Sequence, residues 1–225
     1  HRDLHSFPTR RSSDLAVVGY FWRDLRDLAV DGWRGRGEAR HVILLLLIGT
    51  VPAAILGLLG RGLFERLFAS PVATAWQLAL TGVLLFAADR WHAGERRTGS
   101  LTVGEAVFVG FGQAVAIIPG ISRSGATIAF GLWRGLARAE AARFSFLLSI
   151  PAILGAGLVE ARPILSRAAA GGFGPAYAVG FLAALISGAV SIAFFLRYLR
   201  RGRLLPFAIY CWVAAGIFLG VLAMR

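Results

Sequence analysis

The stretch PGISRSGAT, residues 119–127, places an arginine between two serines inside one of the most apolar parts of the chain. An arginine near the centre of a bilayer costs at least about 2.5–3.5 kcal/mol on insertion scales, so it must face a cavity or a partner. The 12 acidic residues lie in loops or at the ends of apolar runs, so none is an obvious partner. A guanidinium group matches phosphate oxygens well. We therefore expect Arg123 to hold an anion.

The neighbours of Arg123 are suited to the same ligand. A helix that begins here would direct free N–H groups and the positive end of its dipole toward an anion. A structural role is the alternative, because serine and glycine also favour helix contacts in membranes and Arg123 can donate to free carbonyls near Pro119. Gln113 either reaches toward the same place or bridges two helices. The expected site adds three hydroxyl donors and two glycines that let the backbone approach a ligand: Ser122, Ser124, Thr127, Gly120 and Gly125.

The composition indicates that these residues lie in a membrane. The chain has 225 residues, of which 57% are hydrophobic and 16% charged, and its mean hydropathy is +0.68. The apolar residues form runs, as in an all-α polytopic membrane protein. The net charge of +12 does not indicate nucleic-acid binding, because all 24 basic residues are arginines clustered between the runs. The single cysteine, Cys211, lies in an apolar run, so a disulfide is not expected.

About six membrane spans are expected, the first of them partial. A polar loop over 23–40 separates the first two spans. The predicted spans are Leu15–Trp22, His41–Gly60, Val72–Ala88, Phe144–Leu158, Tyr177–Leu196 and Leu204–Met224.

The stretch 103–133 is predicted to be a re-entrant helical hairpin. Pro119 and Gly120 interrupt it, and each arm is too short to cross a hydrocarbon core of about 30 Å. If the hairpin does not cross, the loops 23–40, 90–103, 134–143 and 197–203 share one side and carry 15 arginines against 5 on the other. A crossing would give 11 against 9. The positive-inside rule therefore favours a hairpin whose two ends are cytoplasmic.

Three arginines that follow the hairpin are expected to be solvated cytoplasmic charges, with contact to lipid headgroups as the alternative: Arg134, Arg138 and Arg143. No histidines or carboxylates have the spacing of metal ligands, so no metal-binding residue is predicted.

The first residues of the chain are not expected to be part of the native membrane domain. Residues 1–14 are polar and basic and have no initiating methionine, which favours a non-native leader before a single domain over 15–225. Residues 15–22 then read as the end of a truncated span, and a genuine polar tail is the alternative.

The segment GQAVAIIPGISRSGATIAFGLWRGLARAEAARFSFLLSIPAILGA, residues 112–156, resembles the second signature region of the undecaprenyl-diphosphate phosphatase family, the bacitracin-resistance proteins. The resemblance extends over about residues 16–225. It implies an inverted-repeat membrane fold, here with one half incomplete, in the bacterial inner membrane. It also implies hydrolysis of a polyprenyl diphosphate lipid to the monophosphate, which recycles the lipid carrier of cell-wall synthesis. The resemblance implies that Arg123 clamps the diphosphate as a catalytic residue, with Ser122 and Thr127 as its hydroxyl partners. Gln113 would match the glutamine of the family motif and bind the substrate.

The sequence departs from the family pattern at its beginning. The first signature of the family, an acidic E-x-x-x-E helix followed by serines and a histidine, would precede Leu15. The resemblance implies a divalent cation, Mg²⁺ or Ca²⁺, whose ligands belong to that signature, so we expect the chain as written to show no turnover. A lipid-phosphate transporter or flippase is the alternative function, since transporters also use inverted repeats with midplane sites. The oligomeric state is left open.

Overall fold

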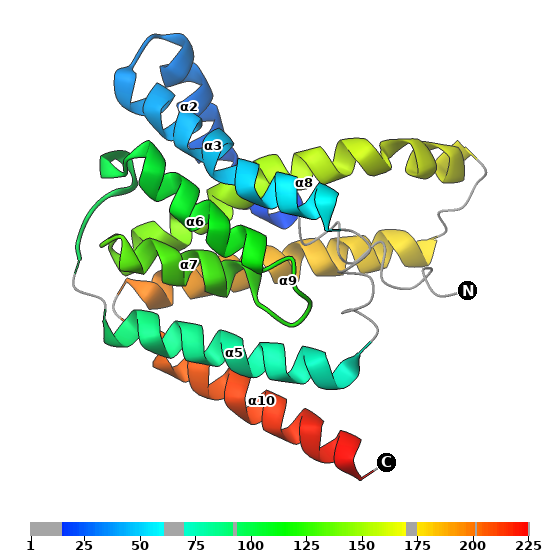
Figure 1. The fold of residues 1–225 in the computed structure, drawn as a ribbon. Coiled ribbons are helices and arrows are strands. Elements are labelled where there is room, and N and C mark those ends of the chain that lie inside the picture. Colours follow the sequence, from blue (N-terminus) through cyan, green and yellow to red (C-terminus); the bar gives the residue numbers. More distant parts are fainter. Residues whose placement is uncertain (1–14, 61–69, 92–93, 170–174, 201, 225) are drawn as a thin grey trace.

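The computed structural model describes residues 15–60, 70–91, 94–169, 175–200 and 202–224. The predicted leader and the arginines Arg61, Arg66 and Arg225 lie outside the described residues. The described part is built from helices, as the sequence predicts (Figure 1). Residues 15–20 are helical, and the elements that follow are α2 (Trp22–Trp33), α3 (Gly37–Leu59), α5 (Pro71–Arg90), the 3₁₀ turn η1 (Thr98–Ser100), α6 (Val103–Val115), α7 (Arg123–Trp133), α8 (Arg138–Ala169), α9 (Pro175–Leu199) and α10 (Leu205–Ala223).

Four of the described helices, α3, α5, α9 and α10, are long and apolar enough to cross a membrane. Their 19 to 25 residues correspond to roughly 28–38 Å of helix. α8 has 32 residues, so it is longer than the predicted span 144–158. The all-α membrane fold is therefore confirmed, with helix ends that extend beyond the apolar runs.

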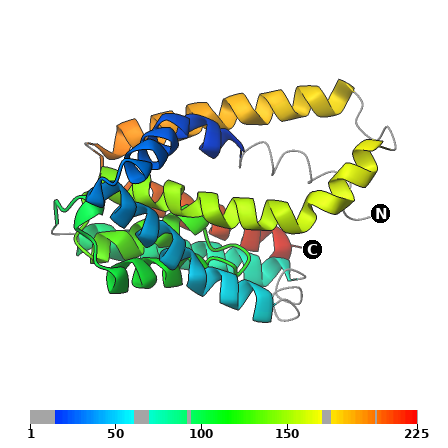
Figure 2. The ribbon, with the colours of Figure 1, turned by 90° about the horizontal axis from the view of Figure 1, so that it is seen from above.

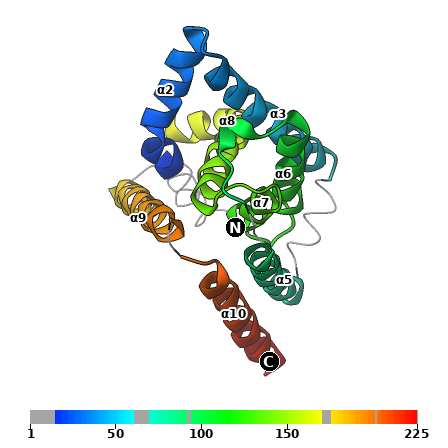
Figure 3. The same ribbon diagram turned by 90° about the vertical axis from the view of Figure 1, so that its left-hand side faces the viewer.

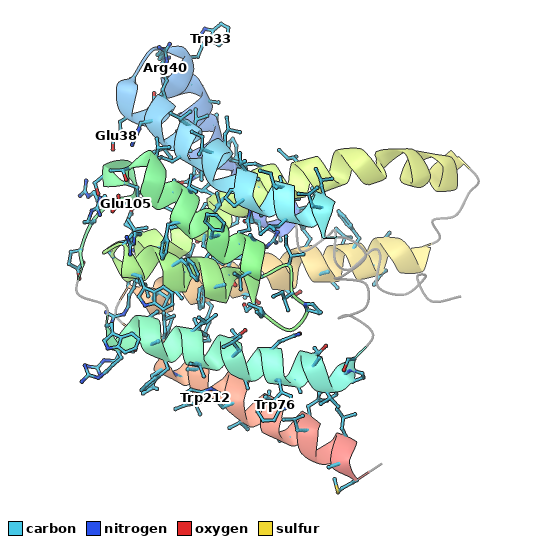
Figure 4. All side chains as sticks on the ribbon, viewed as in Figure 1. Trp33, Glu38, Arg40, Trp76, Glu105 and Trp212 are labelled. Carbon is cyan, nitrogen blue, oxygen red and sulfur yellow. The ribbon has the colours of Figure 1, made fainter. Side chains whose placement is uncertain are left out.

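The prediction of a polar loop over residues 23–40 is wrong. It forms α2, a short turn and the beginning of α3. Leu25 and Leu28 pack against the main core from one side of α2, while its exposed residues include both charged side chains and the apolar Trp22 and Trp33. Arg40 closes the turn by donating from Nε to the Gly32 carbonyl at 2.8 Å. Figure 4 shows Arg40 and Trp33 together at this end of the molecule.

The hairpin consists of two short helices that pack against each other. α6 has 13 residues and α7 has 11, and the break between them contains Pro119 and Gly120, as predicted. α6 runs beside α3 at a pair of glycines: a Cβ added to Gly110 would lie 2.1 Å from the Gly49 carbonyl oxygen. α7 lies between α6, α5 and α8, and the apolar side chains of its inner face, such as Ile128 and Leu132, are fully buried.

The four arginine-rich segments lie at one end of the helix bundle (Figure 1). Polar contacts join three of them directly, because Arg96 donates to the Arg134 carbonyl at 2.9 Å and Arg143 pairs with Asp24. We call this the arginine end. Figure 3 views the molecule from this end, and Figure 2 shows from above that α8 and α9 extend away from it. Both ends of the hairpin lie at the arginine end, as the charge count predicts.

Candidate functional site

The tip of the hairpin is a tight turn that α5 holds from the side. Gly120 has φ +87°, in the left-handed region that favours glycine. A Cβ at this position would lie 2.4 Å from the Thr74 carbonyl oxygen of α5. Gly120 is therefore required by both its backbone angle and the close approach of α5.

Ser122 caps the N-terminus of α7. Its Oγ accepts a hydrogen bond from the Gly125 N–H at 3.2 Å and lies 3.4 Å from the Ser124 Oγ. The Gly125 Cα faces Ser122 and α5, where a side chain would be crowded. An α-helix provides no internal acceptor for its first N–H groups, which here belong to Arg123 and Ser124. The capped turn thus directs donors and the positive end of the helix dipole to one place.

Arg123 is the first residue of α7 and its side chain is exposed. It makes an interaction in the structure, so it is not a free cation. Its position beside Ser122 and Ser124 brings a guanidinium group to the same end of α7 as the capping hydroxyl. Three of the predicted ligands, Ser122, Arg123 and Ser124, therefore share one helix terminus.

Thr127 lies one turn further along α7 and is completely buried. Its Oγ1 donates to the Arg123 carbonyl at 2.8 Å and lies 2.5 Å from the Ser145 Oγ of α8. The hydroxyl of Thr127 thus joins the first turn of α7 to α8. Ser149, one turn beyond Ser145, is also buried and donates to the Phe146 carbonyl at 2.7 Å.

Gln113 is buried in α6, and neither amide atom has a hydrogen-bond partner among the described residues. Its neighbour Gly112 packs against α7, since a Cβ there would lie 2.9 Å from the Phe130 ring. The structure therefore places Gln113 inside the hairpin without joining it to Ser122 or Arg123 by a hydrogen bond. A buried amide without a partner loses its hydration, which costs roughly 1–3 kcal/mol.

α5 contributes two site residues that the sequence analysis missed. The Thr81 Oγ1 accepts a hydrogen bond from the Ser122 N–H at 3.1 Å and donates to the carbonyl of Gln77 or Gly120. The Gln77 Oε1 is buried without a partner, and the Gln77 Cβ would lie 3.0 Å from a Cβ at Gly120. The signal in the sequence is the spacing of Thr74, Gln77 and Thr81, which puts three polar residues on one face of an apolar helix.

The hairpin is fixed at its other end by an ion pair. Glu105, in the first turn of α6 (Figure 4), accepts from the Arg96 Nη1 at 2.7 Å and from the Thr102 N–H at 2.8 Å. The hydrogen bond from Arg96 lowers the pKa of Glu105 most, and burial opposes it by raising the pKa. With the hydrogen bonds from Thr102, which lower it further, the pKa of Glu105 falls to about 2. The carboxylate is therefore charged over the physiological range. This ion pair holds the segment 94–102 against the beginning of the hairpin.

The expectation of three solvated arginines after the hairpin is wrong for Arg134 and Arg138, which are only partly exposed, whereas Arg143 is exposed as predicted. The Arg138 Nη2 contacts the Asp89 Oδ1 at 2.8 Å, and Arg143 pairs with Asp24. The Arg134 guanidinium lies over the Phe108 ring at 4.3 Å. Sequence reasoning missed these partners because they come from other helices.

The donors at the tip suit an anion and do not suit a metal ion. They are hydroxyls, backbone N–H groups and a guanidinium, whereas Mg²⁺ and Ca²⁺ need oxygen ligands that are mostly carboxylates. The described residues contain no group of three or more His, Cys, Asp or Glu that could hold a metal ion. The residues that the structure describes at the tip therefore do not fit the divalent cation that the resemblance implies.

The chain is similar in sequence to a known protein family and to the relatives described below. The family model described as bacitracin resistance protein BacA matches residues 9–217. A protein from Halothermothrix orenii named undecaprenyl-diphosphatase is 38% identical over 93% of this chain and 79% of its own length. A protein of the same name from Syntrophotalea carbinolica is 41% identical over 92% of this chain and 79% of its own length. Another of this name, from Methanothermobacter thermautotrophicus, is 44% identical over 78% of this chain and 97% of its own length.

Proposed function

Since the chain belongs to the family of the bacitracin resistance protein BacA, we propose that its function is the hydrolysis of undecaprenyl diphosphate to undecaprenyl phosphate and phosphate. Its relatives are named for this activity. The observation that carries the proposal is the N-terminus of α7, where Ser122 caps the helix beside Arg123. This arrangement supplies donors for a phosphate inside a helical membrane protein.

The tip binds the diphosphate through charge and hydrogen bonds. The guanidinium of Arg123 pairs with phosphate oxygens in a fork, as it does in other phosphate sites. The N–H groups of the first turn of α7 and the hydroxyls of Ser122 and Ser124 donate to the remaining oxygens. Ser122 keeps this ability because its Oγ uses a lone pair, and not its proton, to cap Gly125.

Hydrolysis breaks the bond between the terminal phosphorus and the bridging oxygen, and a water oxygen forms the new bond. Negative charge grows on the bridging oxygen and remains on the lipid phosphate that leaves. Donors already fixed in place stabilise such charge without reorganising, which is the main contribution a protein makes to phosphoryl transfer. In this proposal, Arg123 and the α7 N-terminus stabilise that charge, and Thr81 and Thr127 hold the turn that positions them.

Gln113 is proposed as a further substrate-binding residue. Its amide is buried and without a partner among the described residues, so a ligand oxygen or hydroxyl that reached it would satisfy it. Gly120 and Gly125 contribute space and not hydrogen bonds from side chains. The residues proposed to act on the diphosphate are therefore Arg123, Ser122, Ser124 and Gln113.

The divalent cation stays a prediction from the resemblance. Because the donor set at the tip fits an anion, we expect binding of the lipid to this chain to survive removal of cations. The check is the retention of undecaprenyl diphosphate by the purified protein with and without EDTA.

We place the protein in the bacterial inner membrane with the arginine end in the cytoplasm. The long apolar helices support a multi-pass membrane protein. The four arginine-rich segments at one end support this orientation by the positive-inside rule.

The proposed function is tested by replacing Arg123. Vesicles containing the protein and labelled undecaprenyl diphosphate report phosphate release, and the detergent-solubilised protein reports lipid retention. We expect Arg123→Ala to lower lipid retention at least tenfold, and any phosphate release by roughly a hundredfold or more, because one fixed donor is worth about that much. Arg123→Lys should recover only part of the loss, since lysine lacks the fork.

The matched control is Arg26→Ala, which removes an exposed arginine of α2 that pairs with the adjacent Asp27. It should leave both readouts unchanged. Lipid retention by Arg123→Ala at the wild-type level would contradict the proposed site. Phosphate release by the wild-type protein would support the proposed hydrolysis directly. Movement of label across the vesicle membrane without phosphate release would favour the transporter.

A further inference from the structure

A cavity with four charged lining residues lies at the arginine end, between the end of α5 and the beginnings of α8 and α10. Its volume is about 370 Å³. It is separate from the hairpin tip, because α5 meets the tip at Thr74 and Thr81 and meets this cavity more than one helical turn later. We call it the α5–α10 cavity, and its lining residues are Phe86, Asp89, Arg90, Arg138, Arg203 and Leu205.

The charges in the α5–α10 cavity are unbalanced. Asp89 is nearly buried and is already bound by Arg138, whose Nε and Nη2 donate to its Oδ1 at 3.0 and 2.8 Å. Arg90 and Arg203 are exposed, and neither forms an ion pair with another residue that the structure describes. The cavity therefore has a neutral pair on one side and two positive charges that have no protein counterion in the described chain.

The apolar part of the lining faces the outside of the bundle. α5 and α10 lie side by side at its edge (Figures 1 and 3). Phe86 is 42% exposed, and Tyr210 and Val213, on the outer face of α10, are 69% and 55% exposed. Large apolar side chains exposed along membrane helices face lipid tails. The cavity thus places exposed arginines at the membrane surface beside apolar side chains of α5 and α10 that face lipid tails.

We propose that the α5–α10 cavity binds the headgroup phosphate of an anionic phospholipid. Arg90 and Arg203 contact the phosphate, and Arg138 stays paired with Asp89 and shapes the site. The acyl chains lie along Phe86 and the outer face of α10. Basic pockets between membrane helices on the cytoplasmic side suit such headgroups, and a free phosphate ion would leave the apolar part of the lining unused. The proposal does not depend on the activity of the hairpin tip.

The experiment is native mass spectrometry of the purified protein titrated with phosphatidylglycerol and, separately, with phosphatidylcholine of the same acyl chains. The wild-type protein should bind phosphatidylglycerol more tightly. We expect the double variant Arg90→Gln/Arg203→Gln to weaken this binding roughly thirtyfold, about fivefold for each arginine near a membrane surface. Binding of phosphatidylcholine should stay the same.

The matched control is Arg197→Gln/Arg200→Gln, which removes the same charge from exposed positions at the same end outside the cavity. An equal loss in this control would show a general effect of surface charge and would overturn the proposal. Inorganic phosphate at millimolar concentration should not displace the lipid, and displacement would show a free-anion site instead. All four arginines are exposed, so the variants should fold, and gel filtration checks this.

Discussion

Thr81 shows how a single hydroxyl can join two helices of the site. It accepts the Ser122 N–H at 3.1 Å, and its own proton goes to a backbone carbonyl. It is fully buried, so water cannot replace it. Without this acceptor, the peptide group before Ser122 is free to rotate, and the position of the Ser122 hydroxyl changes with it. Thr81 is therefore a positioning residue for the α7 N-terminus.

We expect Thr81→Val, which keeps the shape and removes the hydroxyl, to weaken retention of undecaprenyl diphosphate roughly tenfold. The buried N–H left without an acceptor also lowers the free energy of unfolding by about 1–3 kcal/mol. Thr81→Ser restores the acceptor and should restore lipid retention, which a purely structural role of the methyl group does not predict. Both variants are measured by lipid co-purification and thermal unfolding.

The control for Thr81→Val is Thr50→Val. Thr50 lies in α3 and its hydroxyl donates only to the Leu46 carbonyl of the same helix at 2.7 Å. The same chemical change there should leave lipid retention intact. If both variants lose the lipid equally, the hydrogen bond between α5 and Ser122 has no special role.

The residues of the site divide into those the sequence reveals and those it does not. Ser122, Arg123 and Ser124 were predictable because one short motif contains them all, and the helix start that joins them is local. Thr81 lies 41 residues from Ser122, and Ser145 lies 18 residues from Thr127. Such partners depend on which helices pack together, and a single sequence does not specify that.

At the scale of the elements, the hairpin depends on the close approach of α6 to α3. Gly110 and Gly49 meet where a Cβ at Gly110 would lie only 2.1 Å from the Gly49 carbonyl oxygen. Small residues allow such packing between membrane helices, where dispersion forces act over the shortest distances. α2, by contrast, was missed because its charged residues resemble a loop, although Leu25 and Leu28 give it an apolar side.

We expect Gly110→Ala to lower the free energy of unfolding by roughly 1–3 kcal/mol, since overpacking forces the backbones apart. Gly104→Ala is the matched control on the same helix. A Cβ at Gly104 meets nothing within 4 Å, so alanine should be neutral or stabilise the helix by up to about 1 kcal/mol. Thermal unfolding of the two variants in one detergent decides this, and equal melting temperatures would contradict the packing argument.

The beginning of α6 gives the hairpin a defined dependence on pH. Arg96 and the Thr102 donors lower the pKa of Glu105 from 4.5 to about 2, so the folded protein favours the charged carboxylate. The stability from this carboxylate is fully present above pH about 4.5 and is lost as the pH falls toward 2. Glu105→Gln should lower the melting temperature at pH 7 and reduce its fall between pH 5 and pH 3.

Glutamine can still accept the capping hydrogen bond from the Thr102 N–H, so the change isolates the charge. Glu95→Gln is the control, because Glu95 is an exposed residue of the same loop. It should leave the pH profile of the wild type unchanged. Identical profiles for wild type and Glu105→Gln would show that another carboxylate controls the acid response.

At the scale of the whole molecule, the arginines and the hairpin give the same orientation. The charge count predicted that both ends of the hairpin share one side of the membrane, and the structure brings them together with the other arginine-rich segments. The Arg96 side chain, before the hairpin, donates to the Arg134 carbonyl, after it, at 2.9 Å. The count was sufficient because the positive-inside rule depends on the number of arginines and not on how they pair.

The orientation is tested by labelling single cysteines in sealed vesicles, in a Cys211→Ser background. Arg97→Cys precedes the hairpin and Ala139→Cys follows it. We expect both to react with a membrane-impermeant maleimide from the same side, together with the reference Arg36→Cys in the turn between α2 and α3. Met224→Cys, 81% exposed at the far end of α10, should react only from the other side. Reaction of the Arg97 and Ala139 positions from opposite sides would mean that the hairpin crosses the membrane. This outcome would contradict the re-entrant arrangement on which the proposed site at its tip depends.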